Sequence, residues 1–205
     1  YRRHICSNLR RHGMPDNGGF MGTAHGVGFV SGATRRPTVA VFGSSDLAEH
    51  PEIERLCEEL GRAIVDLGCR VACGGLGGVM TAVCRGARTS PKYTEGDTIG
   101  ILPQAEFDAA NEYVDVVIPT ALGLFRNMLV ARSGDACIAV KGGAGTLSEI
   151  AFAWQIQKPV AVMSTTGGWS EELAGTPLDH RYPTEVADLP DVETAASWLT
   201  ETLGL

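Results

Sequence analysis

Residues 135–158 read DACIAVKGGAGTLSEIAFAWQIQK, and this stretch decides the fold. It opens with a short apolar run, DACIAV, continues through a glycine-rich turn, KGGAG, and ends in a run of helical character. An apolar run of this length followed by glycines is typical of a buried strand, and the residues after the turn favour a helix. The stretch therefore predicts a β-strand that passes directly into an α-helix.

The same order recurs along the chain from residue 38 onward. Strands are expected at residues 38–45, 69–75, 97–103, 113–120, 135–143 and 159–165. Helices are expected at residues 51–68, 78–90, 122–134 and 146–158, with a closing helix from about residue 192. The strands are continuous apolar runs, which is typical of strands covered by helices on both faces. The pattern predicts an α/β fold with a doubly wound, mainly parallel, Rossmann-like sheet and right-handed crossovers.

The first 36 residues differ from the rest in charge and composition. Six arginines and one aspartate give residues 1–36 a net charge of +5, whereas the whole chain of 205 residues carries −7, so residues 37–205 carry −12. The basic beginning has no apolar core of a secretory signal, and its glycine-rich continuation shows no period. A flexible tail is therefore favoured over a transit-like segment or a nucleic-acid arm. Residues 37–205 are predicted to form one nucleotide-binding domain.

Composition and motifs argue against several classes of protein. No apolar run approaches the roughly 20 residues of a membrane-spanning helix, so no membrane association is expected. The acidic body lacks the basic footprint of a nucleic-acid-binding protein. The six cysteines form no CxxC pair, which favours buried, reduced thiols in a cytoplasmic protein over a metal site or a disulfide framework. There is no P-loop, no GxGxxG fingerprint and no constellation for pyridoxal phosphate, so no metal or cofactor is expected.

Three of the predicted strands end in turns that parallel strands bring to one edge. The turns contain Gly43, Ser44 and Ser45; Gly74, Gly75, Gly77 and Gly78; and Gly142, Gly143, Gly145 and Thr146. Ligands of open parallel sheets bind at this edge, where glycine allows close approach and free helix N–H groups attract anions. We expect the turns to cradle a phosphate, with an anion near Thr146 or Gly78. The alternative is that the glycines only satisfy tight-turn geometry.

Two charged residues near these turns are candidates for chemistry. Thr146 and Glu149 have the spacing of a capping box, which predicts a helix cap. The same carboxylate, without excluding the cap, is a candidate to activate water or to stabilise a cationic transition state. Arg126 is either a surface arginine or a guanidinium that binds a phosphate or the leaving group. Its helix is expected to bury the neighbouring apolar residues Leu124, Phe125, Met128 and Leu129.

Several segments of the chain resemble the Lonely Guy-like Rossmann superfamily. They are CGGLGGVM, GLFRNM, GILPQAEFDAANEYVDVVIPT and SGDACIAVKGGAGTLSEIAFAWQIQKPV, within residues 38–165. Lonely Guy enzymes are phosphoribohydrolases that cleave nucleoside 5′-monophosphates into base and ribose 5-phosphate. The resemblance implies that Arg126 and Glu149 are the catalytic pair. The expected ligand-binding set also includes Met80 and Asn127, which lie in the matching segments.

The chain departs from the cytokinin-activating branch at two positions. Asn127 and Lys141 stand where that branch has lysine and proline, and the neighbouring segments are closer to the branch of molybdenum-cofactor carriers. Two functions are therefore expected as alternatives: a nucleoside monophosphate hydrolase, or a carrier of a phosphorylated ligand that does no chemistry. A structural protein that uses the fold as an oligomer scaffold is a third. The resemblance implies a homodimer, and the Trp and Phe of FAWQIQ are expected to lie exposed at its interface.

Overall fold

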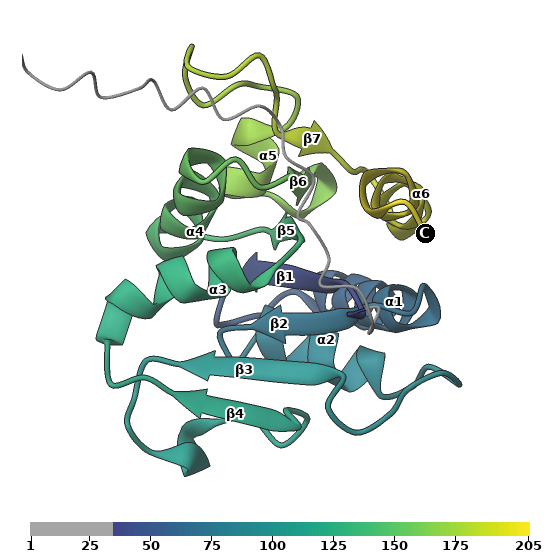
Figure 1. The fold of residues 1–205 in the computed structure, drawn as a ribbon, viewed down its shortest axis with the longest axis vertical. Helices are drawn as coiled ribbons and strands as arrows, with labels where there is room; N and C mark the ends of the chain where they lie inside the picture. The colour runs from purple at the N-terminus through teal and green to yellow at the C-terminus, as the bar shows by residue number, and fades with distance from the viewer. Residues whose placement is uncertain (1–34) are drawn as a thin grey trace, which may run out of the picture. The chain divides into compact units, whose positions relative to one another are not determined.

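The computed structural model describes residues 35–205, and the expectations for residues 1–34 lie outside them. Its seven strands form one sheet in the order β4-β3-β2-β1-β5-β6-β7, with every pairing parallel (Figure 1). The strands are β1 (Thr38–Gly43), β2 (Arg70–Cys73), β3 (Thr98–Leu102), β4 (Val116–Pro119), β5 (Ala136–Val140), β6 (Val160–Met163) and β7 (Ala187–Asp188). The predicted doubly wound, Rossmann-like fold is thereby confirmed.

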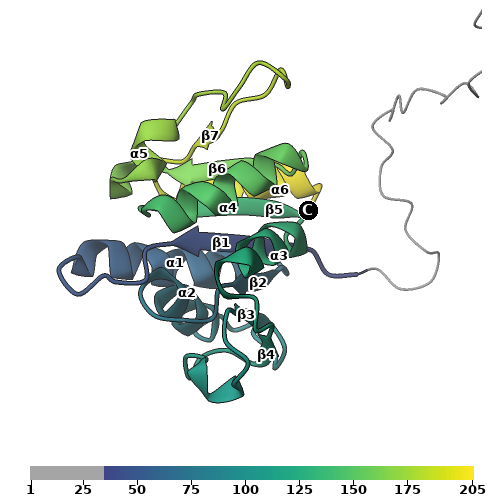
Figure 2. The same ribbon diagram turned by 90° about the vertical axis from the view of Figure 1, so that its left-hand side faces the viewer.

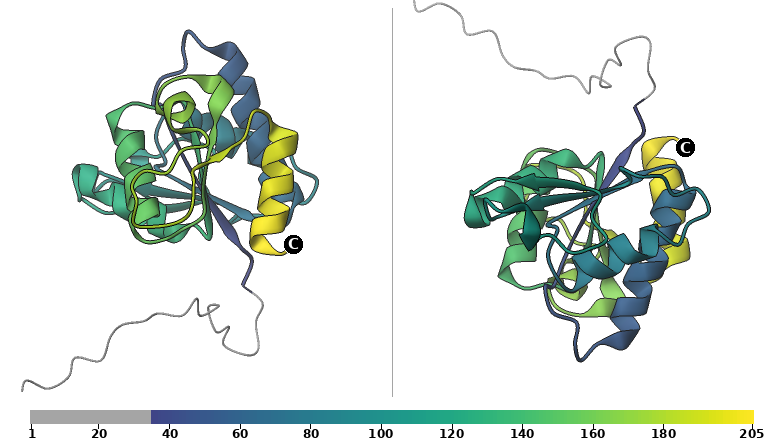
Figure 3. Two further views of the ribbon diagram at one scale, coloured as in Figure 1. Left: turned by 90° about the horizontal axis from the view of Figure 1, so that it is seen from above. Right: turned by 90° about the horizontal axis from the view of Figure 1, so that it is seen from below.

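Helices cover both faces of this sheet. They are α1 (Pro51–Asp66), α2 (Val79–Ala87), α3 (Asn127–Ser133), α4 (Ala144–Gln155), α5 (Trp169–Leu173) and α6 (Val192–Leu203). Figures 2 and 3 show α3 and α4 on one face, and α1, α2 and α6 on the other. Side chains alternate along β1, so Val39 and Val41 pack in the core with α1, α2 and α6, whereas Ala40 and Phe42 pack with α3 and α4.

The strand order reverses beside β1, which places a ligand crevice there. The chain builds the sheet outward from β1 to β4, and then returns to place β5 on the other side of β1. Gly43 and Val140, the last residues of β1 and β5, are direct neighbours in the sheet. The turns that follow these two strands therefore leave the sheet side by side, at the switch point where open α/β sheets bind ligands.

The helix predicted over residues 122–134 consists of two shorter helices, and it buries a different face from the one predicted. A 3₁₀ helix, η2 (Gly123–Arg126), precedes α3, and Arg126 and Asn127 occupy the buried face together with Val130 and Ala131. The prediction that Leu124 and Phe125 are buried is wrong, because they are 83% and 81% exposed. Met128 also lies exposed, and Leu129 is only partly buried. The reason is that the two polar residues bond to α4, so the apolar side chains turn outward.

Other short elements lay outside the prediction altogether. These are α5, β7 and the 3₁₀ helices η1 (Phe107–Ala109) and η3 (Ser164–Thr166). Each is five residues or shorter, too short to show a hydrophobic period. The expectation that Trp154 is exposed is also wrong: it is 5% exposed and packs edge to face on Tyr182, with ring centroids 6.1 Å apart.

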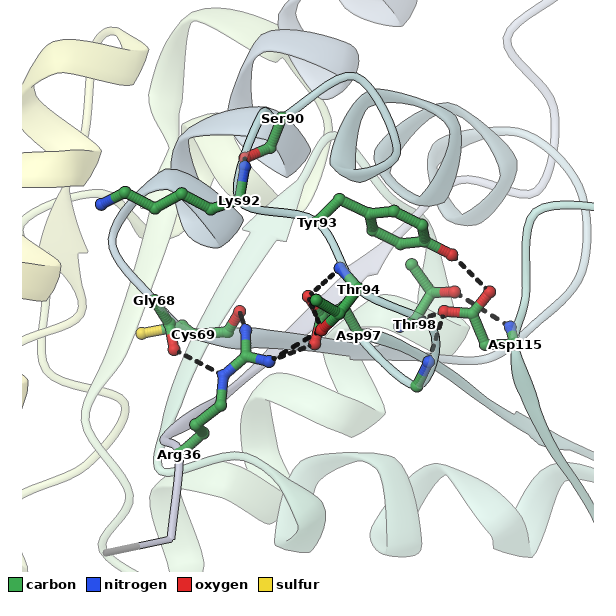
Figure 4. Close-up of polar contacts among 11 residues, drawn as sticks. Arg36, Gly68, Cys69, Ser90, Lys92, Tyr93, Thr94, Asp97, Thr98 and Asp115 are labelled. Carbon is green, nitrogen blue, oxygen red and sulfur yellow. Dashed lines mark hydrogen bonds and ion pairs between the residues drawn. The ribbon is translucent and has the colours of Figure 1, made fainter.

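Buried carboxylates tie the amino ends of the strands together (Figure 4). Asp97 accepts from Arg36 at 2.5 Å and from the main-chain N–H of Thr94 at 2.9 Å. Arg36 also donates to the carbonyls of Gly68 and Cys69, so the last residue of the expected leader contacts the domain. The cysteines of the described part are all buried free thiols, as expected.

Asp115 is the second such carboxylate. It accepts from the hydroxyl of Tyr93 at 2.6 Å, from the N–H groups of Gly96 and Thr98 at 3.0 and 3.2 Å, and from Arg88 at 2.8 Å. Burial alone raises the pKa of this carboxyl, but the hydrogen bonds from Tyr93 and Thr98 lower the pKa below its ordinary value. Its charge is therefore fully compensated within the fold.

Candidate functional site

A pocket of about 420 Å³ lies at the carboxyl ends of the central strands. Of the predicted site residues, it is lined by Gly43, Ser44, Ser45, Gly74, Met80, Arg126, Asn127, Gly143, Gly145, Thr146 and Glu149. The structure adds an apolar lining that the sequence prediction missed: Val41, Phe42, Leu76, Pro103, Gly123 and Leu124. The sequence alone does not single out these residues, because they gather only when separate strand ends and η2 meet.

Four predicted glycines, Gly75, Gly77, Gly78 and Gly142, do not line the pocket. A Cβ at Gly78 would lie 2.3 Å from the carbonyl oxygen of Ser44, and that oxygen already accepts the N–H of Val79, the first residue of α2. A Cβ at Gly75 would lie 2.7 Å from the side chain of Leu102. Close main-chain packing thus accounts for Gly78, whereas a positive φ of +72° and the side chain of Leu102 account for Gly75, and the first N–H of α2 is already bonded to Ser44.

The start of α4 is open by contrast. A Cβ at Gly143 or at Gly145 would meet no atom within 4 Å, and, as at the start of α2, no side chain caps the helix. The first N–H groups of a helix have no intrahelical partner, so they and the positive end of the helix dipole are free to attract an anion. Of the two predicted cradles, this one has the geometry to hold a phosphate.

The predicted capping box does not form. α4 begins at Ala144 with Gly143 at the N-cap position, so Thr146 already lies within the first turn. Glu149 therefore lies beyond the positions that a capping box occupies, and its carboxylate accepts from Arg126 instead. The cap interpretation of Glu149 is wrong for this reason.

Arg126 and Glu149 form a buried pair in the floor of the pocket. Nη1 of Arg126 lies 3.1 Å from Oε1 of Glu149, and the two residues are 7% and 6% exposed. The surface interpretation of Arg126 is therefore wrong. Burial raises the pKa of Glu149 to about 8, although the charge and hydrogen bond of Arg126 act in the opposite direction. Such a carboxyl exchanges a proton near neutral pH.

The guanidinium of Arg126 has unused bonding capacity. Within residues 35–205, its buried Nε has no hydrogen-bond partner. A Cβ at Gly74 would lie 2.4 Å from Nη2, so only glycine leaves room for the guanidinium at this position. A buried donor without a partner is costly, and one in a ligand pocket is expected to find its partner in the ligand.

Asn127 and the segment after β6 hold the cradle in place. Nδ2 of Asn127 donates to Oγ of Ser148 at 2.8 Å, which ties α3 to the first turns of α4. Lys141, with φ of +54°, accepts at its carbonyl from both the N–H and the hydroxyl of Ser170, at 3.1 and 3.0 Å. Its N–H donates to Thr166 at 2.7 Å. Ser170 and Thr166 are buried supports of the turn that the sequence prediction missed.

The described residues contain neither a metal centre nor a membrane-spanning element. Within residues 35–205, no group of three or more His, Cys, Asp or Glu is placed to hold a metal ion. No helix of that range is long and apolar enough to cross a membrane.

The fold and the pocket define a Rossmann-like protein of the Lonely Guy-like superfamily, as the sequence predicted. The chain belongs to the SLOG cluster4 family, whose model matches residues 36–190. An uncharacterized protein of Archaeoglobus fulgidus is 38% identical over 60% of this chain and 77% of its own length. The cytokinin riboside 5′-monophosphate phosphoribohydrolase of Mycobacterium marinum is 29% identical over 69% of this chain and 81% of its own.

A solved structure extends the comparison to the carrier branch. The molybdenum cofactor binding protein of Rippkaea orientalis is 30% identical, with a TM-score of 0.71, over 83% of this chain and 99% of its own. The superfamily is thus established, with similarity to proteins of both expected functions.

Proposed function

We propose that the protein hydrolyses the N-glycosidic bond of a nucleoside 5′-monophosphate and releases the base and ribose 5-phosphate. The observation that carries the proposal is the buried pair of Arg126 and Glu149, which places a carboxyl with a pKa of about 8 in the pocket. Similarity to the phosphoribohydrolase of Mycobacterium marinum supports it. The open start of α4 offers N–H donors for the 5′-phosphate, and the Ser44–Ser45 turn lines the pocket beside it. The apolar wall of Leu76, Met80, Pro103 and Leu124 suits the face of a base.

The proposed reaction proceeds through a water molecule. Glu149 in its ionised form takes a proton from water, whose oxygen attacks C1′ of the ribose as the N-glycosidic bond breaks. The electron pair of that bond goes to the base nitrogen, which receives the proton from Glu149. The carboxylate also stabilises the positive charge that develops on the ribose, as in other glycoside cleavages. Arg126 orients the substrate and stabilises negative charge with its unpaired Nε.

A panel of nucleoside 5′-monophosphates tests this proposal. Free base is measured by chromatography, and binding is measured by calorimetry on the same samples. Glu149→Gln is expected to lower base release by about two orders of magnitude or more while binding persists, because glutamine keeps the hydrogen bond but cannot accept the proton. Undiminished release in Glu149→Gln, or no release from any member of the panel, would reject it.

A second candidate is a carrier that grips a phosphorylated ligand such as molybdenum cofactor without chemistry. Asn127 favours this candidate, because its amide is bonded to Ser148 and supplies no charge where the cytokinin-activating branch has lysine. Similarity to the protein of Rippkaea orientalis supports it as well. In the panel experiment a carrier binds without releasing base, and Glu149→Gln leaves binding intact.

We also propose that the protein acts as a homodimer in the cytoplasm. Seven large apolar side chains of η1, β4 and the segment from Leu122 to α3 are exposed, and we call them the apolar rim: Phe107, Val116, Ile118, Leu122, Leu124, Phe125 and Met128. Apolar groups gathered on neighbouring segments favour a protein contact over free exposure. Buried free thiols suit a reducing compartment. Light scattering is expected to give a dimer for the wild type and a monomer for Phe125→Ser; a monomeric wild type would reject the dimer.

A further inference from the structure

A second pocket, of about 450 Å³, lies at the other end of α4 from Gly143 and Gly145. Its lining residues come from the end of α4 and the turn after it, the start of β6, the segment that leads into β7, and the helix α6. Its volume is within the range of small-molecule sites, which are mostly apolar with a few polar groups that fix orientation. It shares no lining residue with the first pocket.

Aromatic and proline side chains form much of this second pocket. Trp154 of α4 and Tyr182 meet edge to face, with an angle of 62° between their rings. Trp198 of α6 lines the pocket as well, together with Pro159 and Pro183. Aromatic rings pack favourably against the faces and edges of other rings, so this lining suits a planar aromatic group.

One basic side chain in the lining lacks an acidic partner. Lys158 is partly buried, and none of the ion pairs within residues 35–205 includes it. Asp179, which neighbours Trp154, is already paired with Arg181. Glu185 also lines the pocket but is exposed, where water screens its charge. Lys158 therefore supplies a positive charge beside the aromatic lining that is available to pair with a bound anion.

We propose that this pocket binds a small aromatic carboxylate. The ring packs among Trp154, Tyr182 and Trp198, and the carboxylate pairs with Lys158. The proposal goes beyond the proposed hydrolysis, since it concerns a different pocket and a different class of ligand. It also gives the two ends of α4 separate roles: the first turns of the helix lie against the phosphate cradle, and its last turn contributes to the aromatic site.

Fluorine NMR of 4-fluorophenylacetate with the full chain tests the proposal. The probe resonance is expected to broaden in a saturable way at millimolar concentrations or below. Lys158→Met is expected to weaken binding by about tenfold or more, since methionine keeps the apolar stem and loses the charge. The alcohol 4-fluorophenethyl alcohol, which keeps the ring and lacks the carboxylate, is expected to bind similarly weakly to both proteins.

The controls separate this site from the first pocket. Lys92→Met removes a lysine that bonds to the carbonyl of Asp66 elsewhere, and it is expected to leave probe binding unchanged. Glu149→Gln is likewise expected to leave probe binding unchanged. The test of the aromatic site is therefore independent of the proposed hydrolysis. Absence of saturable broadening, equal affinity in folded Lys158→Met, or displacement of the probe by nucleoside monophosphates in wild type would overturn the proposal.

Discussion

The amino ends and the carboxyl ends of the strands each hold a buried carboxylate that is paired with an arginine. The two carboxylates differ in the number of hydrogen-bond donors around them. At the amino edge, Asp115 accepts from a tyrosine, two main-chain N–H groups and Arg88, and its pKa is lowered. At the carboxyl edge, Glu149 accepts only from Arg126 within the described residues, and its pKa is raised to about 8. A carboxylate whose oxygens already accept several hydrogen bonds within the fold has a structural role. A buried carboxylate with few donors is available to interact with a ligand.

Beyond changes to Glu149 itself, the largest effect is expected from filling the space above Gly74. Gly74→Ala places a methyl group 2.4 Å from Nη2 of Arg126, so the guanidinium has to move. Under the proposed function, base release is expected to fall by about a hundredfold, the scale on which a misplaced catalytic group acts. The free energy of unfolding is expected to fall less than in a variant that clashes with main chain, because the displaced groups are the far ends of flexible side chains.

Gly86→Ala is the matched control for that variant. A Cβ there would lie 2.0 Å from the carbonyl oxygen of Glu58, where α1 and α2 pack closely and the clash is with main chain. This variant is expected to lose stability and to keep its activity per folded molecule. The two variants are compared by urea unfolding and by initial rates. A Gly74→Ala protein with normal rates would contradict a catalytic role for Arg126.

Asp115→Ala tests the structural role of the fully hydrogen-bonded carboxylate. It leaves the hydroxyl of Tyr93, two N–H groups and Arg88 without their acceptor, so the free energy of unfolding is expected to fall by about 2 kcal/mol or more. Urea unfolding measures the loss, and nucleotide binding per folded molecule is expected to stay unchanged. A variant as stable as the wild type would show that the network contributes little.

Ser170→Ala is expected to have the smallest effect. It removes one of two hydrogen bonds to the carbonyl of Lys141 and loosens the turn before Gly143. The binding free energy is expected to fall by about 1 kcal/mol. This appears as a several-fold weaker affinity for nucleotide or phosphate, with an unchanged catalytic rate constant. Ser170→Thr, which keeps the hydroxyl, is the control. A reduced rate constant at full affinity would contradict a role in holding the cradle.

Sequence reasoning predicted the sheet because strand periodicity and glycine turns are local properties. It placed Glu149 and Arg126 among the candidates but could not choose between cap and catalytic carboxylate, because their pairing joins residues 23 positions apart. It placed Phe125 in the core for a similar reason: which face of a helix is buried depends on partners in α4. It missed Ser170, whose role arises only from a contact with Lys141, 29 positions earlier.

The pH dependence of stability in the wild type and in Glu149→Gln tests the central claim most directly. Since the pKa of Glu149 is raised from 4.5 to about 8, the folded protein retains a proton that the unfolded chain releases. The stability from this proton is fully present below pH 4.5 and is lost as pH rises toward 8, whereas glutamine does not titrate. The free energy of unfolding of the wild type, relative to the variant, is therefore expected to decrease across that range. A difference that stays constant or increases would contradict the account of Glu149 as a carboxylate left short of donors.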